Sequence, residues 1–132
     1  MGQVTAPPQP VVLRPGDRVC DSNRLQEGGC GVRFLAVHDG HIQPAFAVRH
    51  AGRVVAYLNR CAHKLVELDW QQGDFFDAAC RYLVCATHGA LYDPASGVCV
   101  DGPCRGAGLT AVPVHEADGA VWLAGTPVVV VK

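Results

Sequence analysis

Two short clusters, each pairing one cysteine with one histidine, constrain this chain more than any other feature. The first cluster holds Cys61 and His63, and the second holds Cys85 and His88. Together they supply two thiolates and two imidazoles, a set that can hold a metal centre. A structural zinc site uses the same residue types, but its usual order places the two cysteines together and the two histidines together. Mixed pairs instead suit a centre in which one metal takes only sulfur and the other only nitrogen.

The residues that follow the second cluster extend the pattern. The segment Cys85-Ala86-Thr87-His88 is followed directly by Gly89 and, three positions later, by Tyr92, and Gly102-Pro103 lies further along the chain. This arrangement resembles the Rieske-type [2Fe–2S] family, and most closely its small soluble ferredoxins. The resemblance extends over about residues 20–124 and is densest between Asn59 and Gly106.

The resemblance implies a cofactor, its ligands and its partners. One [2Fe–2S] cluster per chain is expected, with Cys61 and Cys85 on one iron and His63 and His88 on the other. Such a centre carries single electrons, so the expected partners are redox proteins, namely a reductase and a terminal oxygenase or reductase. Imidazole ligands also place Rieske potentials above those of plant-type ferredoxins.

The same resemblance implies which residues surround the cluster without binding iron. These are Gly89, Ala90, Tyr92 and Pro103. In this family the loop that contains the proline, here residues 102–106, covers the cluster, and an aromatic hydroxyl at the position of Tyr92 hydrogen-bonds a ligand sulfur. High-potential members carry a serine at the position of Ala90. The alanine therefore predicts a potential on the low side of the Rieske range.

The segment between the two clusters departs from the commonest form of the motif. Residues 64–84 separate the pairs, a longer gap than usual, and we expect the extra residues to enlarge segment 66–81 without changing the ligand loops. Val66 and Thr87 occupy the positions of a disulfide that ties the loops together in respiratory members, so that disulfide is expected to be absent. Trp70 is expected either to shield the cluster or to pack beneath its lobe.

Short apolar runs separated by turn residues predict an all-β fold. The expected strands are residues 32–38, 45–50, 54–59, 75–77, 82–85, 111–115, 120–124 and 128–131. We expect a Rieske-like antiparallel β-sandwich base, residues 11–58 and 107–132, with a smaller inserted cluster-binding lobe at about 59–106. A chain of 132 residues fits one domain, here 11–132, after a flexible segment at residues 1–10.

Local signals predict two hairpins and little helix. One hairpin is expected at residues 50–53 and another at Asp118-Gly119, because Asp-Gly readily adopts the positive φ angles of a tight turn. One or two helical turns are expected within residues 21–27, capped by Asp21 or Ser22 and ended by the glycines that follow.

The remaining cysteines, histidines and tryptophan receive no ligand role. Five cysteines lie outside the two clusters: Cys20, Cys30, Cys80, Cys99 and Cys104. Most of them are expected to be small buried hydrophobes. Cys104, which follows the proline of the covering loop, is instead expected to line the cluster pocket. Four histidines without paired spacing are expected at the surface: His38, His41, His50 and His115. Trp122 is expected in the core.

Charge and length narrow the possible functions. A net charge of −1 and a pI near 6.6 give no footprint for nucleic acid or an anionic membrane. No signal peptide or membrane span is expected, and the cytoplasm is the expected location. The leading hypothesis is a soluble one-electron carrier between a reductase and an oxygenase or other terminal enzyme, without a substrate of its own. The alternatives are a permanent electron-transfer subunit of an oxygenase or nitrite-type reductase and a structural zinc-binding module.

Overall fold

The computed structural model describes residues 12–60, 67–69, 73–85, 89–102 and 107–129. Within these ranges the regular secondary structure is almost entirely β-strand, which confirms the predicted all-β class. The strands in chain order are β1 (Val12–Leu13), β2 (Arg18–Asp21), β3 (Val32–His38), β4 (His41–His50), β5 (Arg53–Leu58), β6 (Leu83–Val84), β7 (Leu91–Tyr92), β8 (Cys99–Asp101), β9 (Thr110–Ala111), β10 (Val114–Ala117), β11 (Ala120–Leu123) and β12 (Val128–Val129). Segment 1–10, predicted to be flexible, lies outside the described residues.

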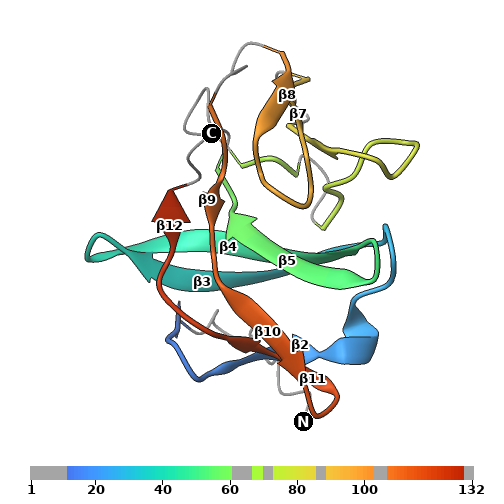
Figure 1. Ribbon diagram of the computed structural model, residues 1–132. Coiled ribbons are helices and arrows are strands. Elements are labelled where there is room, and N and C mark those ends of the chain that lie inside the picture. Colours follow the sequence, from blue (N-terminus) through green and yellow to red (C-terminus); the bar gives the residue numbers. More distant parts are fainter. Residues whose placement is uncertain (1–11, 61–66, 70–72, 86–88, 103–106, 130–132) are drawn as a thin grey trace, which may run out of the picture.

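Three sheets form three layers (Figure 1). The middle layer has the order β1-β3-β4-β5-β9-β12, and the lower layer has the order β10-β11-β2. We call these two layers the base sheets. The upper layer, β6-β7-β8, is the small sheet. The strands pair in antiparallel fashion as predicted, except that β1 runs parallel to β3.

Strand β4 is buried on both faces and therefore joins two cores. Four consecutive side chains, Ala45 to Val48, are 0% exposed. Because side chains alternate along a strand, Ala45 and Ala47 face the lower core between the base sheets, and Phe46 and Val48 face the upper core beneath the small sheet. The small sheet thus rests on the same strand that organises the base.

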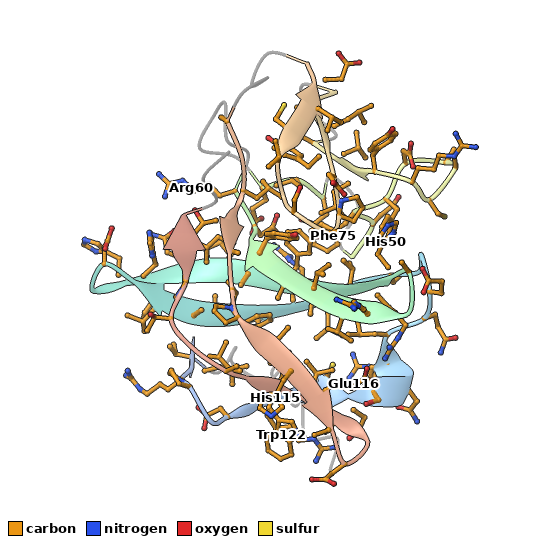
Figure 2. All side chains as sticks on the ribbon, in the orientation of Figure 1. His50, Arg60, Phe75, His115, Glu116 and Trp122 are labelled. Carbon is orange, nitrogen blue, oxygen red and sulfur yellow. The ribbon has the colours of Figure 1, made fainter. Side chains whose placement is uncertain are left out.

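Aromatic contacts fix the small sheet and its flanking segments on the middle layer. Phe75 stacks on Phe46 with ring centroids 3.9 Å apart and planes inclined by 10°. Figure 2 shows Phe75 between these two layers. Tyr57 of β5 is buried, and its hydroxyl donates a 2.6 Å hydrogen bond to the carbonyl oxygen of Pro94. Burial raises the pKa of Tyr57, so this hydroxyl keeps its proton and remains a donor.

Three hairpins use paired residues with positive φ. The two predicted hairpins are present, with φ of 53° and 76° at Ala51-Gly52 and 53° and 74° at Asp118-Gly119. A third joins β3 to β4 through Asp39-Gly40, with φ of 52° and 74°. This Asp-Gly pair carries the same signal as the predicted one, and the sequence analysis missed it.

Several local predictions were wrong or held only in part. One of the one or two helical turns expected within residues 21–27 is present, as the 3-10 helix Ser22–Arg24, but Asp21 makes no side-chain capping bond. The single strand predicted at 111–115 is two strands, β9 and β10, which belong to different sheets. Pro113 lies between them and lacks the N–H that a continuous strand requires. Residues 75–77 form one isolated bridge, between Phe76 and Leu83, instead of a strand.

The second tryptophan also differs from its prediction. Val121 and Leu123 of β11 are buried in the lower core, whereas Trp122 points to the opposite face and is only half-buried. Its indole N–H donates a 3.0 Å hydrogen bond to the carbonyl of Ala117, and it lies beside the exposed His115 of β10 (Figure 2). Trp122 therefore covers the outside of the lower sheet.

An arginine connects the two base sheets. Arg49 of β4 donates from both terminal nitrogens to the carboxylate of Glu116 on β10, at 3.0 and 2.6 Å (Glu116 is labelled in Figure 2). Its Nε also donates to the carbonyl of Leu25 at 2.8 Å. The hydrogen bond from Arg49 lowers the pKa of Glu116 from 4.5 to about 2.

Candidate metal centre

The second ligand loop begins where β6 ends. Cys85 follows directly after Val84 and is 0% exposed. Its backbone N–H donates to the carbonyl of Ala90 at 2.9 Å, and the N–H of Gly89 donates to the carbonyl of Cys85 at 2.7 Å. Gly89 has a φ of 69°, a conformation that glycine adopts without strain. These features close the loop between β6 and β7 and place the cysteine at its buried end.

The segment that leads into the proline loop touches this ligand loop. Gly102 has a φ of 103°, and a Cβ at this position would lie 2.8 Å from the Cα of Ala90. Ala90 is itself 0% exposed. Only glycine fits so close an approach of two backbones. The start of the predicted covering loop is therefore packed against the second ligand loop.

Tyr92 lies shortly beyond the ligand loop. It belongs to β7, where it pairs with Leu83 of β6 and Cys99 of β8, and it is 0% exposed. The small sheet and the core beneath it thus enclose this tyrosine completely. The hydrogen bond from its hydroxyl to a ligand sulfur, which the family resemblance implies, stays a prediction.

The first ligand loop follows β5. Asn59, the residue after this strand, is only 1% exposed, and its backbone N–H donates to the carbonyl of Pro44 at 2.8 Å. Its side chain bonds to Leu68 and to Asp69, both of which lie beyond the loop. Sequence reasoning missed Asn59 and Asp69, because polar residues near a turn give no signal of burial.

The structure describes four of the eight predicted site residues. Cys85, Gly89 and Ala90 lie between β6 and β7, and Tyr92 is the last residue of β7. The other four predicted site residues lie outside the described residues: Cys61, His63, His88 and Pro103. The same is true of four further residues discussed above: Val66, Trp70, Thr87 and Cys104. In the described ranges, no three His, Cys, Asp or Glu side chains come together as a second metal site would require.

The other cysteines and histidines were predicted only in part. Cys20 and Cys99 are buried as expected, and burial raises the pKa of the Cys20 thiol. Cys30 and Cys80 are exposed, so the prediction of burial was wrong for both. His50, predicted at the surface, is half-buried against the ring of Phe76 with centroids 6.2 Å apart. His41 and His115 are exposed as predicted, and His38 is half-buried.

Comparison with known proteins identifies the family. The sequence matches the Rieske [2Fe-2S] domain over residues 18–131, which is most of the chain. The chain belongs to the Rieske [2Fe–2S] domain family. A search of curated protein sequences found no match. No helix within the described ranges is both long and apolar enough to cross a membrane.

Solved structures of Rieske proteins share the fold. The chain is similar to the ferredoxin of carbazole 1,9a-dioxygenase from Nocardioides aromaticivorans IC177, with 24% identity, a TM-score of 0.66, and 86% of this chain and 100% of the ferredoxin covered. It is similar to the Sphingomonas yanoikuyae B1 ferredoxin at 22% identity and a TM-score of 0.62, covering 83% and 97%. The terminal oxygenase of carbazole 1,9a-dioxygenase from the same Nocardioides strain matches with 23% identity and a TM-score of 0.64. This match covers 87% of this chain but only 30% of the oxygenase.

The donor set of this Rieske domain fits a [2Fe–2S] cluster. Two thiols and two imidazoles, arranged as mixed pairs, are the ligands that a Rieske cluster requires. The described thiol, Cys85, lies at the buried end of a closed loop, beside the approach of Gly102 to Ala90. Cys85 and Ala90 are both inaccessible to water in this arrangement.

Proposed function

We propose that this protein is a soluble one-electron carrier that accepts an electron from a reductase and passes it to a terminal oxygenase or reductase. The observation that supports it most is the match to a dioxygenase ferredoxin over the whole length of that ferredoxin, at 24% identity and a TM-score of 0.66, within a chain that belongs to the Rieske [2Fe–2S] domain family. A second relative is a ferredoxin described in complex with its oxygenase, at 22% identity and a TM-score of 0.63.

In this proposal four side chains hold the cluster, Cys61 and Cys85 on one iron and His63 and His88 on the other. The cluster supplies reversible one-electron chemistry at a potential that imidazole ligation raises. The protein keeps the cysteine side dry through the buried position of Cys85. The proposed domain division, a base and a lobe at about 59–106, places both ligand pairs in the lobe. A cytoplasmic location is supported by the thiols Cys20, Cys30 and Cys80.

The alternative is a permanent subunit of a larger oxidoreductase. It is supported by the match to the terminal oxygenase, in which the same fold forms part of a longer chain. Size-exclusion chromatography of the native protein separates the two functions. A carrier elutes as a small species that associates only transiently with partners, whereas a subunit co-elutes with a large partner.

The test of the cluster compares two cysteine variants. The wild-type protein should contain iron and acid-labile sulfide in equal amounts and give a rhombic EPR signal after reduction. Cys85→Ser should lose the cluster, whereas Cys20→Ser, which removes a buried thiol from the other core, should retain it. Stoichiometric zinc without sulfide in the wild-type protein would contradict the proposal and favour a structural zinc module.

The test of the carrier function is a coupled assay. A reductase with NADH should reduce the purified protein, and the reduced protein should then support a terminal oxygenase. Activity on a small molecule by the isolated chain would contradict the carrier function. Loss of transfer in Cys85→Ser but not in Cys20→Ser would connect it to the cluster.

A further inference from the structure

A buried polar network joins the two ends of the first ligand loop. The side-chain amide of Asn59 donates from Nδ2 to Oδ1 of Asp69 at 2.9 Å, and its Oδ1 accepts the backbone N–H of Leu68 at 2.9 Å. Asn59 lies two residues before Cys61, and Leu68 lies five residues after His63. One side chain therefore bridges the chain entering the loop and the chain leaving it.

The carboxylate at the centre of this network is fully paired. The side chain of Asp69 is 0% exposed, and its Oδ2 accepts the N–H of Gly73 at 2.9 Å and lies 3.4 Å from Nε of Arg33. A buried carboxylate is strongly unfavourable unless it is paired and hydrogen-bonded. Arg33 also forms an ion pair with Glu67, so it holds two positions beyond the ligand loop.

The network is anchored to the base. Arg33 belongs to β3, and Asn59 is hydrogen-bonded through its backbone N–H to Pro44 of β4 at 2.8 Å. On the far side, the N–H of Gly31 donates to the carbonyl of Gly73 at 2.8 Å. The network is thus held to β3, which contributes to the lower core, and to β4, which contributes to both cores.

We propose that Asn59, Asp69 and Arg33 form a positioning clamp that closes the first ligand loop and so retains the cluster and fixes its histidine ligand. The clamp rests on the proposed cluster site and adds residues that do not touch the metal. Its action is local because Asn59 and Leu68 lie at the two ends of segment 60–67. A broken clamp leaves the sheets paired but removes the link between Asn59 and residues 68 and 69.

A swap of the two polar residues gives the sharpest test. Asn59→Asp places two carboxylates together, and Asp69→Asn removes the charge that pairs with Arg33. In the double variant Asn59→Asp/Asp69→Asn, the new carboxylate at position 59 can accept from the N–H of Leu68 and from the new amide at position 69. The oxygen of that amide can in turn accept from Gly73. The net charge is unchanged in the double variant, and the matched control is Glu116→Gln, which breaks an ion pair in the base.

Three readouts separate positioning from general stability. These are the rate at which visible cluster absorption is lost at a fixed temperature, the EPR g values of the reduced protein, and the far-UV CD melting temperature. Each single variant should lose the cluster at least about tenfold faster than wild type, because a hydrogen bond to a charged group is lost. Its g values should shift, and its far-UV CD spectrum at the assay temperature should remain that of a folded protein, although its melting temperature falls because a buried charge loses a partner. The double variant should restore the wild-type g values and bring the loss rate back to within about threefold.

Two results would contradict the proposed clamp. Single variants with the wild-type loss rate and g values, or a folded double variant without rescue, would overturn the clamp. If Asp69→Asn does not fold, Arg33→Lys takes its place. This variant keeps the positive charge, on a side chain that is 30% exposed, but removes the Nε that lies beside Asp69, so the same changes in loss rate and g values are expected. A wild-type protein without a cluster would count against the proposed function, whereas a stable cluster in every variant would count against the clamp alone.

Discussion

The close approach of Gly102 to the second ligand loop allows a prediction with a matched control. Gly102 and Gly16 have similar positive φ angles, 103° and 96°. An alanine at either position incurs left-handed strain of about 1–2 kcal/mol. The Cβ of Gly102→Ala would also lie 2.8 Å from the Cα of Ala90, whereas that of Gly16→Ala would meet no atom within 4 Å.

The steric clash with Ala90 should make Gly102→Ala less stable than Gly16→Ala. Carbon atoms in contact are normally about 3.5–4.0 Å apart, and a backbone Cα cannot rotate aside as a side chain can. Overpacking of this kind costs about 1–3 kcal/mol. Gly16→Ala should therefore lower the free energy of unfolding by about 1–2 kcal/mol, and Gly102→Ala by about 2–5 kcal/mol.

Two measurements on the cluster-containing proteins check this reasoning. The far-UV CD melting temperature of Gly102→Ala should lie about 4–12 °C below that of Gly16→Ala, given the entropy of unfolding of a chain of this size. The visible absorption of the cluster should decay faster in Gly102→Ala than in Gly16→Ala or the wild-type protein, because the segment at Gly102 leads into the predicted covering loop. Equal melting temperatures and equal decay rates in the two variants would refute the argued contact between Gly102 and Ala90.

Two further predictions concern acid stability and redox tuning. The pKa of Glu116 falls from 4.5 to about 2 on folding, so its stabilising effect is present above pH 4.5 and is lost as the pH falls through about 2. Glu116→Gln should lower the free energy of unfolding by about 1 kcal/mol at pH 7, after allowance for solvent screening, and the difference in urea unfolding should shrink toward pH 3. An undiminished difference would contradict the pKa. Ala90→Ser should raise the midpoint potential by about 30–100 mV, because an added donor stabilises the reduced cluster; voltammetry showing no rise with the cluster intact would contradict the alignment of this loop with the family.

Sequence patterns predicted the class of fold and the motif, because both depend on local signals. Alternating apolar residues and Asp118-Gly119 specify strands and a tight turn within a few positions. The pattern at residues 111–115 is equally apolar, yet Pro113 divides it between two sheets. Trp122 lies in a predicted strand but on the outer face. Alternation shows that two faces exist, and only the packing of other strands decides which is buried.

For the site residues, too, the sequence predicted only what depends on residues close together in the chain. The pattern from Cys85 to Tyr92 specified a loop, and the structure shows it closed between β6 and β7. The partners of Asn59 could not be found in the same way. Asp69 is separated from it by the whole ligand loop, and Arg33 comes from β3. A polar residue reveals its burial only through partners that the fold supplies from elsewhere in the chain.

The long segment between the ligand pairs need not loosen the site, because its described residues are packed onto the base. Phe75 stacks on Phe46, and a Cβ at Gly31 would lie only 2.8 Å from the ring of Phe75. Together with the hydrogen bond from Gly73 to Asp69, these contacts anchor the segment between the two loops. The extra residues therefore have their own attachment to β3 and β4. Strain in the segment would reach the first ligand loop through the buried amide of Asn59, which is why its removal should affect the cluster before the fold.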